Sequence, residues 1–157
     1  STENRFNHDN LYWNYRLSGL QAALGISQLK NLKYTIETKI KQGEKYQELL
    51  SDHKEELQLP LRELNNEKNH YWVFGVVLRK AERSKIMEAL RIDGIQTREF
   101  FWPLHLQNAL PKDYRKKNIN LSVSENLGKN GFYLPLGAHI NNKKQEFIVN
   151  KLLNHLN

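Results

Sequence analysis

The chain contains no cysteine among its 157 residues. This absence excludes a disulfide framework, a thiolate metal site and a cysteine nucleophile. It also favours a reducing compartment, for which the cytoplasm is the simplest expectation. The longest apolar run, residues 71–78, is far shorter than the roughly 20 residues that a membrane-spanning helix needs. We therefore expect no membrane segment.

Common local signatures of catalysis are also missing. No two of the six histidines are two, three or four residues apart, so no metal site is expected. The sequence has neither the G-x-S-x-G nucleophile elbow nor the glycine-rich loops that cradle phosphates. The histidines are His8, His53, His70, His105, His139 and His155.

The composition is that of an ordered chain of one domain. Hydrophobic residues make up 39% and charged residues 26%, and 157 residues suit a single domain. The chain begins at Ser1 without an initiator methionine or a signal-peptide pattern. A processed start and a piece of a longer protein remain equally open.

The formal net charge is +7, which raises the question of nucleic-acid binding. The basic residues gather best at Lys112 and residues 115–117, in a polar segment. The aromatic residues lie in apolar segments and do not alternate with the basic ones, as a stacking platform requires. A solvated charged loop is the alternative.

A long helix is predicted near the start of the chain. Ser18 and Gln21 have the S-x-x-Q spacing of a capping box, and apolar residues then recur at helical spacing. The pattern predicts one amphipathic helix over residues 18–50, or two nearly collinear ones. Gly25 would let another backbone approach closely, whereas packing on the chain's own core is the ordinary alternative.

The remaining pattern predicts a small mixed α/β (α+β) fold with a sheet of about three strands and helices packed on it. A right-handed crossover is expected if the first two strands lie side by side and parallel. Ser122 and Glu125 form a second candidate capping box, and Phe147, Ile148, Leu152 and Leu156 are expected along one face of the last helix. The expected elements are a connection over 51–69 with an extended piece at 57–61, a doubly covered strand 71–78, a helix 82–93 ended by Gly94, a strand 95–101, a turn 105–109, a helix 122–130 closed by Gly131, a strand 132–135 and a helix from Asn142.

Two segments differ from plain core and plain surface. Residues 12–16 place an amide, Asn14, a phenol, Tyr15, and a guanidinium, Arg16, just before a helix N-terminus, which suits an anion. A turn with a solvated charge is equally open there. Residues 98–107 bring Arg98 and His105 among aromatic side chains, as in a ligand cleft. A core histidine is the alternative for His105.

Together these segments resemble the C-terminal part of the DegT-type nucleotide-sugar aminotransferases, which use pyridoxal phosphate. The similarity extends over nearly the whole chain from His8 onward. The segments that carry it, in family order, are residues 14–18 (NYRLS), 20–25 (LQAALG), 71–74 (YWVF), 94–98 (GIQTR), 103–107 (PLHLQ) and 131–135 (GFYLP).

The resemblance implies a fold-type I enzyme with a large cofactor-binding domain and a smaller C-terminal α/β domain, of which residues 1–157 are the smaller. The lysine that forms the Schiff base stands upstream of Asn14 in the family, and residues 1–13 contain no lysine. Without that anchor, transamination has no electron sink. The chain alone is therefore expected to be inactive.

The resemblance also implies roles for single residues. Asn14 would reach the cofactor phosphate of the other subunit of a homodimer, with Arg16 beside it. Tyr15, Arg98 and His105 would serve the substrate, a nucleotide-linked keto-sugar that receives an amino group, typically from glutamate. The chain departs from the family at Tyr12, where glycine is usual, and at Leu136, where serine is common.

Two other classes of function stay open at the level of sequence. The chain could be a non-catalytic module that binds a partner, or a second copy, through the helix over residues 20–50. A basic nucleic-acid-binding domain is the third alternative, and it predicts a steep salt dependence of binding.

Overall fold

A computed structural model describes residues 15–107 and 120–156. Among the described residues, one compact unit ends at Lys33 and a second begins at Tyr34. The basic cluster at Lys112 and 115–117 and the site candidate Asn14 fall outside the described ranges. The helices are α1 (Gly19–Lys30), α2 (Leu32–Leu49), α3 (Arg83–Ile92), η2 (Leu104–Leu106), α4 (Ser122–Asn130) and α5 (Asn142–Leu156).

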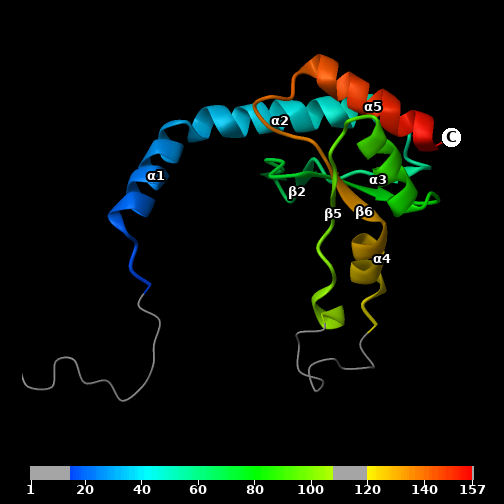
Figure 1. Ribbon diagram of the computed structural model, residues 1–157, viewed down its shortest axis with the longest axis horizontal. Helices are drawn as coiled ribbons and strands as arrows, with labels where there is room; N and C mark the ends of the chain where they lie inside the picture. The colour runs from blue at the N-terminus through cyan, green and yellow to red at the C-terminus, as the bar shows by residue number, and fades with distance from the viewer. Residues whose placement is uncertain (1–14, 108–119, 157) are drawn as a thin grey trace, which may run out of the picture. The chain divides into compact units, whose positions relative to one another are not determined.

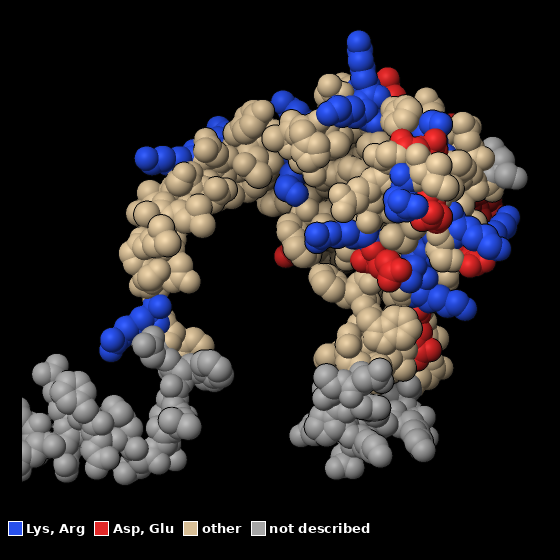
Figure 2. All heavy atoms as spheres, in the orientation of Figure 1, with Lys and Arg blue, Asp and Glu red and all other residues tan. Residues whose placement is uncertain are grey.

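Helix α1 begins where the capping box predicts. The Gln21 amide donates to Ser18 Oγ at 3.2 Å, and the Ser18 amide donates to Gln21 Oε1 at 2.9 Å. The predicted long helix is divided in two at Asn31, the C-cap of α1. Helix α1 buries none of its residues, and Figure 2 shows it almost entirely without charged side chains between its two ends.

A four-stranded sheet forms the centre of the second unit, in the order β1-β4-β6-β5 (Figure 1). All neighbouring strands are antiparallel. A separate hairpin, β2–β3, turns at Asn65 and Asn66, whose φ angles of 52° and 67° suit a two-residue type I′ turn. The strands are β1 (Leu57–Gln58), β2 (Glu63–Leu64), β3 (Glu67–Lys68), β4 (Phe74–Leu78), β5 (Arg98–Glu99) and β6 (Gly131–Leu134).

The sheet corrects three sequence expectations. It has four strands instead of about three, and the expected strand 95–101 pairs only at Arg98 and Glu99. Strand β6 lies between β4 and β5, so these two are not side by side and form no direct crossover. The strand order differs from the expected one because β6 pairs with both β4 and β5. These pairings join distant parts of the sequence, so the pattern within one segment does not reveal them.

The hydrophobic core lies between the sheet and the helices α2, α3 and α5. Phe74, Val76 and Leu78 alternate along β4 toward this core, and Val77 on the opposite face is also buried. The expectation of a strand covered on both faces is thus confirmed for β4. From the helices, the core receives Tyr46, Leu50, Ile86, Leu90, Ile148, Val149 and Leu152.

The helix ends and faces are partly as expected. Gly94, with φ of +80°, ends α3, and the Ile95 amide donates to the Leu90 carbonyl at 2.8 Å, which makes a Schellman motif. In α5 the buried face runs through Gln145, Ile148, Val149 and Leu152. Phe147 is exposed, contrary to expectation, because adjacent helical residues point about 100° apart.

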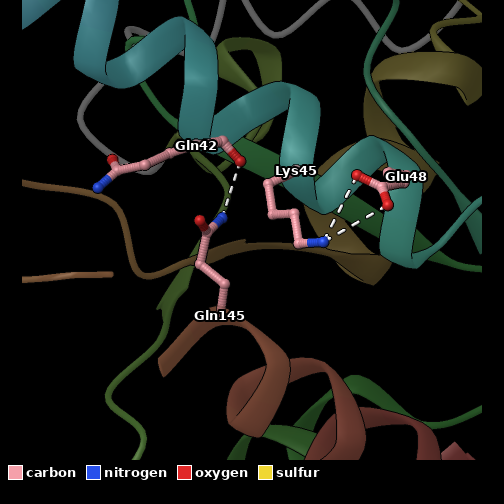
Figure 3. Close-up of polar contacts among 4 residues, drawn as sticks. All are labelled: Gln42, Lys45, Glu48 and Gln145. Carbon is pink, nitrogen blue, oxygen red and sulfur yellow. Dashed lines mark hydrogen bonds and ion pairs between the residues drawn. The ribbon is translucent and has the colours of Figure 1, made fainter. Parts of the chain in front are cut away.

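A buried amide network ties α2 to α5 and to the loop between β6 and α5. Gln42 Nε2 donates to the carbonyls of Gly137 and Ile140 at 2.8 and 2.6 Å, while Gln145 Nε2 donates to the Gln42 carbonyl at 2.8 Å (Figure 3). The Gly137 amide in turn donates to Gln42 Oε1. Gln42 therefore fixes the backbone of residues 137–140.

Helix α2 approaches its neighbour closely at Gly43. A Cβ at this position would overlap the ring of Tyr71, which is buried beneath the helix. Gly25 in α1 has nothing within 4 Å of the corresponding position. The close approach of another backbone to Gly25 stays a prediction, and among the described glycines of residues 18–50 the tight contact is that of Gly43 with the Tyr71 ring.

We expect Gly43→Ala to lower the free energy of unfolding by about 1–3 kcal/mol, since overpacking against Tyr71 outweighs the helix propensity gained. Urea denaturation followed by circular dichroism measures the change. The matched control is Gly25→Ala, which adds the same methyl group to open space and does not lower stability. Equal stability of Gly43→Ala and the parent chain would contradict the packing described.

Candidate functional site

The first site segment leads directly into α1. Tyr15 has a φ of +46°, in the left-handed region that residues other than glycine seldom occupy. Arg16 follows it, two residues before the N-cap Ser18. The capping box uses the Gln21 amide, so the amides of Gly19 and Leu20 remain as donors without an acceptor inside the helix. This end of α1 is suited to an anion.

The second site segment, residues 98–107, packs on the sheet through the aromatic ring of Phe100. Phe100 stacks on Tyr133, with ring centroids 4.7 Å apart. It lies so close to Gly75 of β4 and Gly131 of β6 that a Cβ at either position would overlap its ring. Phe100 also donates its amide to the Gly131 carbonyl at 3.1 Å. The two glycines thus create the space that holds this segment in place.

His105 sits on the short helix η2, at the far end of that segment from Arg98. Its Nε2 lies 2.9 Å from Glu125 Oε1 on α4. The sequence assigned Glu125 to a capping box with Ser122, and this was wrong: Leu121 is the N-cap, and it makes no side-chain capping bond. The Glu125 side chain instead contacts His105, so His105 is not a simple core residue.

Apolar side chains surround His105 and face the solvent. Trp102 is bonded to the same turn, with its Nε1 donating to the Leu106 carbonyl at 3.3 Å. Pro103 is buried against Gly128 of α4. Exposed apolar residues at this end of the unit are Phe101, Trp102, Leu104, Leu106, Leu121 and Val123.

Arg83 of α3 joins β5, which carries Arg98, to α4, which carries Glu125, the partner of His105. Its Nη1 donates to the carbonyls of Gly128 and Gly131, and its Nη2 lies 3.3 Å from Glu99 on β5. The Arg83 side chain is only 15% exposed. No local sequence pattern marks this role of Arg83, because its partners are 16 to 48 positions away.

The site residues named from the sequence fall into two groups. Tyr15 and Arg16 belong to the first unit, whereas Arg98 and His105 belong to the second. Arg98 is opposite Tyr133 in the sheet, and His105 is paired with Glu125. In the described part of the chain, no cluster of three or more possible metal ligands occurs, and no helix is long and apolar enough to cross a membrane.

The comparison with protein families covers almost the whole chain. Residues 1–153 match the model of the DegT/DnrJ/EryC1/StrS aminotransferase family. The chain belongs to this family. The resemblance that the motifs indicated is therefore confirmed.

Curated relatives in this aminotransferase family are longer than the chain. It is 27% identical over 160 residues to GDP-perosamine synthase of Vibrio cholerae, covering 98% of this chain and 41% of that protein. It is also 27% identical over 146 residues to GDP-perosamine synthase of Escherichia coli O157:H7, covering 92% and 38%. The chain thus spans about two fifths of the relatives it matches.

Solved structures share the fold of the chain. GDP-4-keto-6-deoxy-D-mannose-3-dehydratase of E. coli, with bound hydrated pyridoxal phosphate, has a TM-score of 0.77 at 22% identity, covering 96% of this chain and 39% of that one. An aminotransferase of pseudoaminic acid biosynthesis from Helicobacter pylori has a TM-score of 0.77 at 20% identity, covering 94% and 39%. The mixed α/β fold is therefore that of one part of these longer chains.

Pyridoxal phosphate is the cofactor of this aminotransferase family. The donors around Arg16 and the start of α1 fit its phosphate group. Residues 1–29 contain no lysine, so this end of the chain offers no ε-amino group for a covalent bond to the cofactor. The fit is thus to the phosphate alone.

Replacing Arg83 by methionine is expected to lower the free energy of unfolding by about 1.5–3 kcal/mol, because charge-assisted hydrogen bonds to buried carbonyls are lost. Arg91→Met is the matched control on the same helix, where Arg91 makes only an exposed pair with Glu88 that contributes under about 1 kcal/mol. Urea denaturation of both variants measures the two changes in the free energy of unfolding. Equal effects would show that Arg83 does not hold β5 and α4 together.

Proposed function

We propose that residues 1–157 form the C-terminal small domain of a pyridoxal-phosphate-dependent aminotransferase. The enzyme transfers an amino group from glutamate to a nucleotide-linked keto-sugar, in the biosynthesis of amino sugars for the cell surface. The large cofactor-binding domain stands upstream in the same protein, and the complete enzyme works as a homodimer in the cytoplasm. Two GDP-perosamine synthases among the relatives support the class of substrate.

The observation that carries this proposal is the match of residues 1–153 to the aminotransferase family, and the exposure of α1 fits a domain that the rest of an enzyme covers. Leu20, Leu24 and Leu29 are 84%, 63% and 66% exposed, and burying a leucine side chain contributes about 1.5–3 kcal/mol. An isolated helix of 12 residues is marginal in water. A second surface must therefore cover α1, and the large domain with the partner subunit supplies it.

The site residues then have distinct tasks. Asn14 and Arg16 bind the cofactor phosphate across the subunit interface, as the donors at the start of α1 allow. Arg98, His105 and Tyr15 bind the substrate, and Glu125 orients the imidazole of His105 through the 2.9 Å contact. The cofactor supplies the electron sink. This chain supplies orientation and charge, so it is inactive alone.

A non-catalytic partner-binding module is the second candidate, and it is favoured by the same exposed helix. The two candidates differ in what precedes the chain. An enzyme domain requires an in-frame upstream segment with a lysine shortly before Asn14, whereas a module requires none. Sequencing the DNA upstream of the codon for Ser1 separates them, and a stop codon there overturns the enzyme proposal.

The purified chain is expected to form no stoichiometric lysine adduct when incubated with pyridoxal phosphate and reduced with borohydride. Peptide mapping by mass spectrometry measures the modification, and pyridoxal phosphate with acid-unfolded chain gives the background of non-selective labelling. The chain joined to its upstream segment should be labelled at one lysine and release 2-oxoglutarate from glutamate when a keto-sugar nucleotide is present. Selective labelling of one lysine in the isolated chain would overturn the proposal.

A further inference from the structure

Three ionisable side chains outside both site segments join α3 to α5, which pack side by side (Figure 1). Asp93 is the C-cap of α3, and its Oδ1 accepts a hydrogen bond from Lys151 Nζ at 2.8 Å. Its Oδ2 lies 2.8 Å from Nε2 of His155. Lys151 and His155 are four residues apart on α5, so they lie on one face of that helix. One carboxylate therefore holds the end of α3 against the last turns of α5.

This contact differs from the ion pairs on the exposed surface. The side chain of Asp93 is 19% exposed, whereas that of Glu88, which pairs with Arg91 on the same helix, is 55% exposed. A carboxylate that has lost much of its water needs charged or hydrogen-bonding partners. The hydrogen bonds from Lys151 and then His155 hold the pKa of Asp93 below its usual value. The carboxylate is thus ionised at neutral pH.

Asp93 directly precedes the segment that carries Arg98. Gly94, with φ of +80°, ends α3, and Ile95 is buried. Residues 95–97 belong to no helix or strand, and Arg98 begins β5 opposite Tyr133. Because this stretch has no regular structure of its own, its course depends on where its two ends are held. Pairing with β6 fixes one end, and the contact of Asp93 with α5 fixes the other.

The same stretch and α5 form two walls of one cavity. The cavity has a volume of about 600 Å³ and is lined by residues 94–98, by Phe147 and Ile148 of α5, and by Lys39, Trp72 and Lys144 among others. Lys151 Nζ lies 5.7 Å from the centre of the Phe147 ring, within the range of a cation–π contact. The ammonium group of Lys151 therefore links Asp93, at the start of one wall, to an aromatic ring of the other.

We propose that Asp93 is a positioning residue for Arg98. By binding Lys151 and His155, it fixes the end of α3 on α5 and so sets the course of residues 94–98 into β5. The inference rests on the substrate-binding role proposed above for Arg98, but it is tested without substrate or cofactor. A negative result would leave the aminotransferase proposal intact, whereas a stop codon upstream of Ser1 would overturn that proposal and leave the ordering of β5 by Asp93 untouched.

The test compares amide NMR spectra and amide hydrogen exchange of the isotope-labelled chain and its variants. Lys151→Met removes the ammonium group and keeps a long side chain that favours a helix. We expect the amide resonances of Arg98 and its strand partner Tyr133 to shift, because β5 then takes a different position on β6. Exchange of the Ile95 amide, which is hydrogen-bonded to α3, should become about tenfold faster, as the loss of one charge-assisted hydrogen bond implies.

Two further variants separate positioning from general stabilisation. Lys151→Arg keeps a charged donor for the carboxylate and should return the Arg98 resonance to its place in the parent chain. Glu88→Gln is the matched control, because it removes an exposed ion pair on the same helix and should leave the resonances of Arg98 and Tyr133 unchanged. A contact that only stabilised the folded chain would change the free energy of unfolding but not these native-state resonances.

Acidification gives an independent measurement. Because the pKa of Asp93 is lowered in the folded chain, the contact is complete above the usual aspartate pKa of about 3.9 and is lost as the pH falls through the lower folded value. The Arg98 resonance of the parent chain should therefore show a transition in this range that is absent from Asp93→Asn. The groups that face Asp93 from α5 are Lys151 and His155. Glu88 and Glu99 are further carboxylates nearby in the sequence, and their effects remain in Asp93→Asn.

Three results overturn the proposal: unchanged resonances of Arg98 and Tyr133 in Lys151→Met, equal shifts in Glu88→Gln, or no restoration by Lys151→Arg. Thermal unfolding checks that each variant is folded. Should Lys151→Met fail to fold, Asp93→Asn keeps the size of the side chain and removes its charge, and an unchanged Arg98 resonance in that variant overturns the proposal by itself.

Discussion

Helix α1 buries none of its residues, so no hydrophobic core stabilises it within the described part of the chain. Helix α1 has a well-formed capping box at its start, yet every large apolar side chain on it faces the solvent. Local capping contributes about 1 kcal/mol, which does not offset the entropy of ordering twelve residues. In the aminotransferase proposed above, the large domain and the partner subunit supply the surface that orders α1.

The second unit is different, because its helices and sheet enclose a core. Tyr46, Phe74 and Phe132 are fully buried there, and α2, α3 and α5 close one face of the sheet (Figure 1). The site segment that carries Phe100 packs on the other face of the sheet. Phe100 fits over Gly75 and Gly131, and Arg83 links α3 to β5 and α4. The position of His105 thus depends on contacts that Phe100 and Arg83 make on other elements.

Local signals predicted the local structure well. The capping box at Ser18 and the glycine stop at Gly94 depend on a few neighbouring residues, and both were found as predicted. The place of β6 between β4 and β5 depends on pairing across some 55 residues, so periodicity alone does not reveal it. The contact between His105 and Glu125 joins a loop helix to α4, and it was missed because Glu125 fitted a local capping pattern equally well.

The motifs predict the family because their order along the chain carries information that no single motif has. They indicated Arg98 and His105 as parts of a site. The cavity beside Arg98 was not anticipated, since Lys39, Trp72 and Lys144 come from separate segments and share no sequence pattern.

Amide hydrogen exchange of the purified chain, at a concentration where sedimentation shows a monomer, tests the central claim most directly. The account predicts nearly unprotected amides throughout α1 and strong protection in the buried half of α2 and in β4, because only the second unit has a core. Addition of the upstream large domain should then protect α1. Protection of α1 in the isolated monomer, equal to that of β4, would contradict the account.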